Sequence, residues 1–214
     1  VSLMTTTQLF ILSVISLSFA AGFVPASTWG KTTSRHHSTV PCVTETKVAN
    51  TGRVKAGDAL PAGVMLVEGT ADGSKQVYNI REFCSGKKVV LFAVPGAFTP
   101  GCSKSHMPSF AAAADEMFKK GVDAIICTAT NDPYVMEGWG RDQGVVGKIL
   151  LLSDAETSLA SSFGVLQDGG GGMPRSERYS MIIEDNIIKH VFFAMENGVK
   201  DADKTYAPNV MKYL

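Results

Sequence analysis

The segment from residue 89 to residue 108, VVLFAVPGAFTPGCSKSHMP, constrains the fold of this chain more than any other. It begins with a continuous apolar run, which predicts a central β-strand covered on both faces. The run stops at a turn rich in proline and glycine, and Cys102 follows that turn directly. Alanine-rich sequence then predicts a helix that ends at Gly121, with Pro108 bending its first turns. The segment therefore predicts a strand, a rigid turn and a helix that begins at a thiol.

The remaining patterns extend this unit into an α/β domain. GVMLVEG and KQVYNI predict a hairpin, and the buried-strand patterns VDAIICTAT and KILLLSD are each followed by a helical pattern. A glycine-rich loop, QDGGGGMPRSE, leads into RYSMIIEDNIIKHVFF, which predicts two strands joined at Asp185 and Asn186, and APNVMKYL predicts a terminal helix. This order is that of a thioredoxin-like sheet, and the pattern alone predicts an α/β domain in three layers.

Length and charge exclude several classes of function. The chain has 214 residues, of which 45% are hydrophobic, so it can form one domain with a substantial core. Its 20 basic and 20 acidic residues give a net charge of zero, which argues against a nucleic-acid surface or a polyanionic substrate. The charge is uneven, because residues 1–44 contain Lys31 and Arg35 but no acidic residue. The start of the chain is therefore expected to be a separate kind of segment.

Residues 1–50 have the composition of a cleavable targeting leader, and the folded domain is expected at 51–214. The apolar run 9–24 is shorter than the about 20 residues that span a bilayer, and it ends in small residues, as signal-peptide cores do. A Ser/Thr-rich stretch with basic residues follows, as in transit peptides. Two signals in series resemble the bipartite presequences of plastids bounded by extra membranes, which implies a plastid protein with no membrane anchor in its mature form. A secreted protein with a flexible pro-segment, or import into another organelle, is the alternative.

Four cysteines, Cys42, Cys84, Cys102 and Cys127, occur without a CxxC pair or the paired spacing of a zinc site. A disulfide scaffold is a poor fit, because the domain is large and apolar enough to fold without one. The adjacent histidines of the leader fit its basic composition better than a metal site. No metal is therefore expected, and each thiol has to be judged by its surroundings.

Cys102 is the thiol whose predicted surroundings favour reactivity. At a helix start its sulfur faces backbone N–H groups without helical partners, which favours the thiolate. The helix dipole contributes only about 0.3–1 kcal/mol, so a hydrogen-bond donor and a cation are needed as well. Thr99 can direct its hydroxyl at the sulfur, Pro95 fixes the turn, and Gly96 and Gly101 allow close approach by a small substrate. The alternative, a cysteine packed as a small apolar residue, does not explain its place after the turn.

The signature PGAFTPGC, with Pro95, Thr99 and Cys102 in fixed spacing, resembles the active-site signature of the peroxiredoxins. It is similar in particular to the type II group, which includes the peroxiredoxin-5-like atypical two-cysteine enzymes. The resemblance extends from about Val54 to Leu214 through CTATNDPYVMEGWGR, KILLLSD, ERYSMIIED and APNV. It implies a thioredoxin-like fold, with a central mixed β-sheet flanked by helices, and a thiol-dependent peroxidase without a cofactor.

The resemblance also implies roles for individual residues. Cys102 would be the thiolate that attacks the peroxide and becomes a sulfenic acid, with Thr99 hydrogen-bonded to it and Pro95 shielding it. Arg178, which precedes the tyrosine of ERYS, would be the active-site cation that stabilises the thiolate and the charge on the leaving oxygen. Arg141, in GWGR, matches another arginine of the group and would support substrate binding.

The fate of the sulfenic acid is less constrained. Cys127 stands in a context, CTATND, that matches a possible resolving cysteine of the type II group, but a cysteine that ends an apolar strand also packs well in a core. A disulfide needs Cα atoms within about 7 Å, so the start of the Cys102 helix would have to unwind. Another branch of the group carries its resolving cysteine just before the terminal helix. The matching segment here, DKTYAPN, contains no thiol, which excludes that route. Cys84 is expected to be structural. Resolution would use Cys127 or an external thiol from glutaredoxin, thioredoxin or glutathione.

Three alternatives remain open. His106 could pair with Cys102 as in a cysteine hydrolase, but Pro108 disturbs that spacing and no orienting residue is evident. The glycine run at 169–172 lacks the Lys and Ser/Thr of a phosphate-binding loop and is expected to be a mobile loop beside Arg178. The domain could also be a redox-dependent binding or chaperone module.

The expected partners are hydrogen peroxide or alkyl hydroperoxides, an electron donor and a second copy of the chain as a homodimer.

Overall fold

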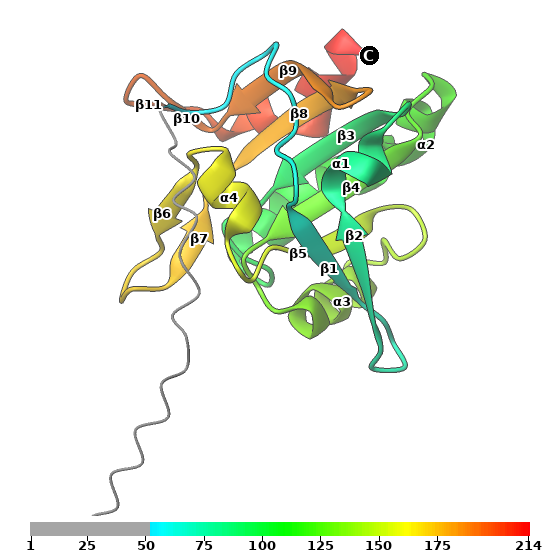
Figure 1. Cartoon of the computed structure of the whole chain (residues 1–214), viewed down its shortest axis with the longest axis vertical. Coiled ribbons are helices and arrows are strands. Elements are labelled where there is room, and N and C mark those ends of the chain that lie inside the picture. Colours follow the sequence, from blue (N-terminus) through cyan, green and yellow to red (C-terminus); the bar gives the residue numbers. More distant parts are fainter. Residues whose placement is uncertain (1–51) are drawn as a thin grey trace, which may run out of the picture. The chain divides into compact units, whose positions relative to one another are not determined.

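A seven-stranded mixed sheet forms the centre of the described residues, 52–214, in a computed structural model (Figure 1). The strand order is β2-β1-β5-β4-β3-β8-β9. β3, β4 and β5 pair parallel to one another. Each strand of the two edge pairs, β1 and β2 at one edge and β8 and β9 at the other, is antiparallel to its neighbours. The strands are β1 Met65–Gly69, β2 Lys75–Asn79, β3 Lys88–Ala93, β4 Ala124–Ala129, β5 Leu150–Ser153, β8 Tyr179–Glu184 and β9 Ile187–Phe193.

Helices cover both faces of this sheet, which confirms the predicted α/β domain with three layers. The α-helices are α1 Ile80–Cys84, α2 Met107–Lys119, α3 Pro133–Asp142, α4 Ser158–Ser162 and α5 Ala207–Val210. Short segments of other helix types are η1 Cys102–His106, η2 Ala202–Thr205 and η3 Met211–Tyr213. Buried residues of α2, α3 and α5 share one core cluster, and those of α1 and α4 share the other.

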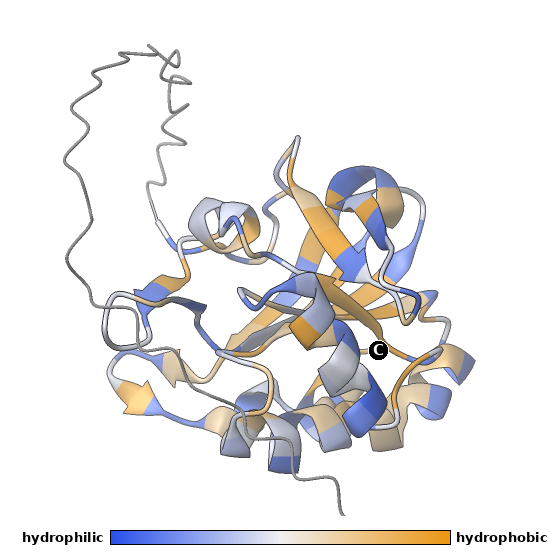
Figure 2. Cartoon of the chain, turned by 90° about the horizontal axis from the view of Figure 1, so that it is seen from below, coloured by the Kyte–Doolittle hydropathy of each residue, from blue (hydrophilic) through white to orange (hydrophobic). Residues whose placement is uncertain are grey.

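β3 contributes to both clusters, as its continuous apolar sequence predicts. Val90 and Phe92 lie in the α2 cluster, whereas Val89 and Leu91 lie in the α1 cluster, and all four are fully buried. Burial of each such side chain stabilises the fold by about 1.5–3 kcal/mol. Figure 2 shows the hydrophobic strands running through the interior, with hydrophilic segments on the helices around them. β3 is therefore a rigid base for the turn that follows it.

Local side-chain caps and a tight turn fix several element ends. The Asn79 side chain accepts hydrogen bonds from the first N–H groups of α1, and Asp132 does the same for α3, in which Pro133 is the first residue. Asp185 and Asn186 both have positive φ and form the turn between β8 and β9. The caps fix the starts of α1 and α3, and the turn confirms the hairpin predicted at Asp185 and Asn186.

The glycine-rich segment predicted as a loop forms the turn of a short hairpin instead. β6 Leu166–Asp168 pairs with β7 Pro174–Ser176, and Gly170 to Gly172 all have positive φ, which other residues rarely adopt. A second hairpin joins β10 Met195–Glu196 to β11 Val199–Lys200. Both hairpins lie close to the carboxyl end of β3 through contacts described below.

The described residues fall within one compact unit. Within 52–214, no helix combines the length and apolar character needed to cross a membrane. The predicted leader, including Cys42, lies outside the described residues.

Candidate active site

Cys102 lies where the chain leaves the turn after β3 and begins η1, as the sequence predicts. The side chain is 1% exposed and belongs to the α2 cluster. Before it, Phe98 adopts a positive φ of 58° and is 56% exposed, so the turn projects outward while the sulfur points inward. A positive φ at a phenylalanine is uncommon and marks a constrained backbone.

η1 is a π-helix, and this is the form taken by the distortion predicted at Pro108. The Met107 N–H donates to the Cys102 carbonyl, five residues back, and Pro108 has no N–H to offer the preceding turn. The wider turn directs both Cys102 and His106 into the core. π-turns of this kind are frequent at functional sites.

Arg178 is the residue that contacts the Cys102 sulfur. It immediately precedes β8, whose Tyr179 pairs with Ala93 at the end of β3, so the sheet brings Arg178 to the turn. Its Nη2 donates a hydrogen bond to Cys102 Sγ at 3.1 Å. Its Nη1 is buried and has no hydrogen-bond partner among the described residues. The guanidinium thus supplies the cation expected beside the sulfur, and it retains donor capacity for a further group.

Thr99 lies in the same turn, but its hydroxyl does not donate to the sulfur. Thr99 Oγ1 donates to the Gly96 carbonyl at 2.8 Å, and the Thr99 carbonyl accepts from the Ser103 N–H at 2.9 Å. The predicted hydrogen bond from this hydroxyl to the sulfur is therefore wrong, because the Gly96 carbonyl is the acceptor within the turn. The hydroxyl oxygen keeps lone pairs that can accept a hydrogen bond.

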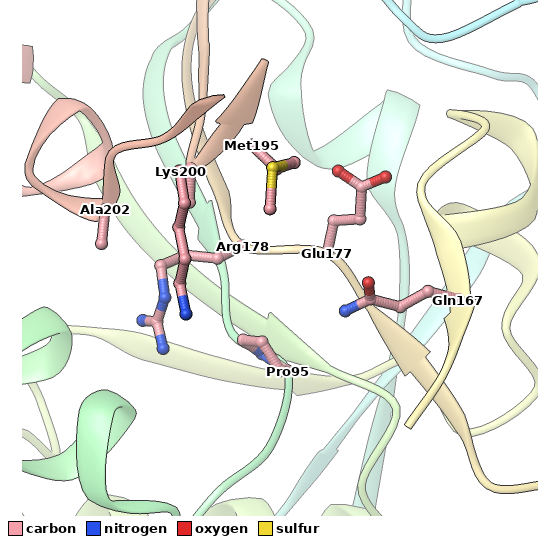
Figure 3. A pocket seen from close by; sticks show the side chains of 8 residues that line it. Pro95, Gln167, Glu177, Arg178, Met195, Lys200 and Ala202 are labelled. Atoms are coloured by element: carbon pink, nitrogen blue, oxygen red, sulfur yellow. The ribbon is translucent and has the colours of Figure 1, made fainter. Parts of the chain in front are cut away.

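Pro95 and Arg178 share the wall of a pocket of about 330 Å³ beside the turn (Figure 3). The remaining lining residues are Gln167, Glu177, Ala194, Met195, Lys200 and Ala202. Gly101 does not line this pocket in the way predicted. A Cβ atom at Gly101 would lie 3.4 Å from Arg178 Nη2, so this residue lies beside the guanidinium that reaches the sulfur.

Cys127 lies in β4, opposite Phe92 of β3, and is fully buried in the same cluster as Cys102. Burial raises the pKa of Cys127 well above its usual value; negative charge at Cys102 raises it further, and Arg178 opposes both. Cys84 lies on the other face of the sheet, where burial raises its pKa to about 12. Cys84, Cys102 and Cys127 are all free thiols. Cys127 and Cys84 are therefore protonated at neutral pH.

The structure does not bring Arg141 to the Cys102 site. Arg141 lies in α3, and its Nε forms an ion pair with Glu137 Oε1 of the same helix at 2.7 Å. It lines a separate pocket that includes Glu68 and Thr70. Glu137 lies four residues before Arg141 on the same helix face, so the two side chains pair with each other and Arg141 does not reach Cys102.

His106 shares the inner side of η1 with Cys102 but is a neutral packing residue. Its Nε2 donates to the Thr205 carbonyl at 3.0 Å, and its ring lies 5.0 Å from that of Phe92. Burial, together with the charge of Arg178, lowers the pKa of His106 to about 3. A histidine that stays neutral and is held by Thr205 does not fit the cysteine–histidine pair of a hydrolase.

Two residues near the turn were not predicted. The Asn131 Oδ1 accepts a hydrogen bond from the Ala97 N–H at 2.9 Å and another from Arg175 Nη1 at 3.4 Å. Both contacts join residues more than thirty positions apart, so no local pattern in the sequence indicates them. Within 52–214, no group of three or more metal-ligating side chains is present.

A family model described as Redoxin matches residues 55–206. The chain is 38% identical over 143 residues to "Peroxiredoxin-2E, chloroplastic" of Arabidopsis thaliana, a match that covers 65% of this chain and 61% of that protein. It is 37% identical over 190 residues to "Peroxiredoxin-2E-2, chloroplastic" of Oryza sativa subsp. japonica, covering 86% of this chain and 83% of the relative. The match therefore spans less than two thirds of the Arabidopsis relative.

Solved structures of peroxiredoxins also resemble this chain. Reduced Prx3 of Vibrio vulnificus in complex with H2O2 superimposes with a TM-score of 0.68 at 35% identity, covering 75% of this chain and 98% of the other. Peroxiredoxin 5 of Alvinella pompejana superimposes with a TM-score of 0.58 at 34% identity, covering 64% and 88%.

Proposed function

Because this chain belongs to the redoxin family and, within it, to the type II peroxiredoxins, which are thiol-dependent peroxidases of thioredoxin-like fold, we propose that Cys102 and Arg178 form its peroxide-reducing centre. The observation that carries this proposal is the 3.1 Å hydrogen bond from Arg178 Nη2 to Cys102 Sγ. A thiol with a guanidinium donor at hydrogen-bond distance is stabilised as a thiolate, which is the nucleophilic form.

In the first step, the Cys102 thiolate attacks one oxygen of a peroxide. The S–O bond forms as the O–O bond breaks, so the sulfur loses two electrons and becomes a sulfenic acid. The other oxygen leaves as hydroxide or alkoxide and takes up a proton to give water or an alcohol. The buried, unpartnered Nη1 of Arg178 supports a role in stabilising charge on that oxygen. Thr99 Oγ1, which already donates to Gly96, accepts the peroxide O–H, and Pro95 limits access of water.

In the second step, we propose that Cys127 resolves the sulfenic acid. Its sulfur displaces the hydroxyl group of Cys102, which leaves as water, and a Cys102–Cys127 disulfide forms. A thioredoxin-type reductant then returns two electrons and two protons. Cys127 is on the same face of the sheet and in the same cluster as Cys102, which supports this route. On this route η1 unwinds first, so that the two buried sulfurs can reach the geometry of a disulfide.

Intact-mass measurement of the oxidised chain tests the second step. One equivalent of peroxide without reductant should give a product two hydrogens lighter than the reduced form, whereas Cys127→Ser should stop at the sulfenic acid, one oxygen heavier. Cys84→Ser is the matched control, because Cys84 lies on the opposite face and should not change the product. Accumulation of sulfenic acid in the unaltered chain would contradict a resolving Cys127 and would assign resolution to an external thiol.

The pocket beside Arg178 offers room for the organic part of an alkyl hydroperoxide (Figure 3). Ala202→Phe places a large ring in this pocket of about 330 Å³. The rate with cumene hydroperoxide should then fall at least several-fold, while the rate with hydrogen peroxide, which is much smaller, should change little. Equal losses with both peroxides, or none with either, would contradict this assignment of the pocket.

A multiple-turnover assay distinguishes the enzyme from a redox-dependent binding or chaperone module. The purified chain, supplied with hydrogen peroxide and a dithiol reductant, should consume many equivalents of peroxide for each equivalent of protein. Consumption of one equivalent followed by arrest under continued reductant supply would favour the binding module.

We further propose that the protein is imported into a plastid. The signal-like and transit-like composition of residues 1–50 supports this, as does the word "chloroplastic" in the names of both plant relatives. The chain without its signal-like part but with its transit-like part should be imported by isolated plastids and give a shortened product that is protected from added protease. Export of the intact domain from the cell would contradict it.

The donor and the assembly are also proposals. Glutaredoxin or thioredoxin would serve as the electron donor, and the relative rates with each in the turnover assay decide between them. The proposed homodimer would form through the active-site turn, on which Phe98 is exposed. A sedimentation measurement that finds the monomer at all concentrations would contradict it.

A further inference from the structure

Arg175 is enclosed between two glycines that belong to distant parts of the chain. Its guanidinium lies against Gly96 in the active-site turn, where an added Cβ atom would be 2.5 Å from Arg175 Nη1. Its aliphatic stem lies against Gly169 in the glycine-rich hairpin, where an added Cβ would overlap Arg175 Cγ. Real Cβ atoms do not approach other atoms this closely, so neither glycine can be replaced without moving the arginine. The glycines thus mark a built contact between the hairpin and the turn.

Asn131 joins this contact to the sheet. Its Oδ1 accepts hydrogen bonds from Arg175 Nη1 and from the Ala97 N–H, the residue after Gly96. The Asn131 carbonyl accepts from Ser153 Oγ at 2.6 Å, which ties this residue to the end of β5. The hairpin is anchored as well, because Thr130 Oγ1 donates to the Pro174 carbonyl at 2.8 Å. Arg175 therefore contacts the turn from a hairpin that is itself hydrogen-bonded to the segment directly after β4.

The contact reaches the reacting groups through Gly96. The Gly96 carbonyl accepts the Thr99 hydroxyl, so the position of Gly96 determines where the lone pairs of Thr99 Oγ1 point. Thr99 Cγ2 would also lie 3.3 Å from an added Cβ at Gly96, which shows how closely the two residues pack. Among the described residues, the hydrogen-bond partner of the Cys102 sulfur is Arg178 and not Arg175. The two arginines thus act on different parts of the site.

We propose that Arg175 is a positioning residue for peroxide reduction, which holds the turn 95–99 so that Thr99 can orient the peroxide in front of Cys102. The glycine-rich hairpin exists, on this account, to deliver Arg175 to Gly96. The inference rests on the proposed peroxidase function and adds a residue that acts through the turn and Thr99, whereas Arg178 contacts the sulfur directly. It predicts that loss of Arg175 separates two reactivities of Cys102 that normally occur together.

The test compares peroxide with an alkylating reagent in the full chain carrying Arg175→Ala. The second-order rate with hydrogen peroxide should fall by about tenfold to a hundredfold, the scale on which small misplacements reduce catalysis. Alkylation of Cys102 by iodoacetamide at pH 7, which needs the thiolate but no oriented peroxide, should stay within about twofold of the unaltered chain. Arg81→Ala is the matched control, since Arg81 lines a different pocket with Asn79 and Glu82 and should leave both rates unchanged.

Two results would overturn the inference. If both rates fall together in Arg175→Ala, the arginine acts on the thiolate or on the fold and does not position the turn. If neither rate falls, it has no role in the reaction. A chain that fails to turn over peroxide before any substitution would instead contradict the proposed function, so the two failures are distinguishable.

A double-mutant cycle gives a second measurement that does not depend on one variant folding well. As a single substitution, Gly96→Ala should lower the peroxide rate, because its Cβ meets the Arg175 guanidinium. The same substitution should lower the rate less in a chain that already carries Arg175→Ala. Additive losses would contradict the contact. Should Arg175→Ala fail to fold, Arg175→Lys keeps the stem beside Gly169 but loses the planar guanidinium. It should show the same selective loss of peroxide rate, and an unchanged rate would overturn the proposal.

Discussion

Replacement of Cys102 by serine should abolish peroxide turnover. A serine hydroxyl has almost the same size as the thiol, so the packing around this buried side chain should survive. It is a much weaker acid, however, and it has no counterpart of the sulfenic acid state. The expected loss is at least about three orders of magnitude, the scale on which removal of a nucleophile reduces turnover in other enzymes. Peroxide consumption in the presence of a dithiol reductant measures it.

Cys84→Ser is the control for this substitution. Cys84 is as deeply buried as Cys102 but packs against the opposite face of the sheet, and its raised pKa keeps it protonated. This variant should retain turnover close to that of the unaltered chain. Residual turnover in Cys102→Ser above about a hundredth of the original would show that another thiol reacts, and it would contradict the assignment of the nucleophile.

Replacement of Arg178 by methionine should reduce the rate with hydrogen peroxide by about a hundredfold to a thousandfold, the usual cost of one lost transition-state donor. The guanidinium donates to the sulfur through Nη2, and its Nη1, which has no hydrogen-bond partner within residues 52–214, is available to the leaving oxygen, so both reactants lose a partner. Methionine fills much of the space without charge. Stopped-flow measurement of peroxide consumption gives the rate.

Iodoacetamide alkylation of Cys102 should also slow in Arg178→Met, because the thiolate itself loses its hydrogen bond. This joint loss is the opposite of the selective loss expected for Arg175→Ala. Arg178→Lys should be intermediate, since one ammonium keeps the charge but cannot reproduce the fork of two donors. A normal alkylation rate in Arg178→Met would contradict stabilisation of the thiolate by this arginine.

The elements of the fold are predictable where local chemistry decides them. The apolar run of β3 and the turn at Asp185 are encoded within a few residues, and both are found where they were expected. The caps Asn79 and Asp132 are equally local signals. The position of Cys102 at the start of a helix follows from the same logic, because the turn before it can be neither strand nor helix.

The contacts of the site follow from strand pairing, which local patterns do not encode. Arg178 reaches Cys102 because β8 pairs antiparallel with β3, and without the family resemblance it would resemble any exposed charge at a strand end. Arg175 depends on a hairpin whose sequence predicts only a loop. Arg141 shows the reverse case, in which a residue matched by resemblance pairs with its own helix neighbour, Glu137. Local sequence therefore predicts the nucleophile better than it predicts the groups that act on it.

Thr99 shows that a correct residue can have a different contact. The sequence places its hydroxyl near the sulfur, but the turn offers the Gly96 carbonyl as an acceptor and the hydroxyl donates there. The same geometry leaves its lone pairs free, which changes its proposed role from a donor to the thiolate into an acceptor from the peroxide.

The central claim is that Cys102 is the thiol that peroxide oxidises, and trapping of the sulfenic acid tests it most directly. Reduced Cys127→Ser protein, which retains Cys84 and Cys102 among the described residues, would be treated with one equivalent of hydrogen peroxide in the presence of dimedone and then digested for mass spectrometry. The account predicts a dimedone adduct on the peptide that contains Cys102 and none on the peptide that contains Cys84. An adduct on Cys84, or no adduct while peroxide is consumed, would contradict it.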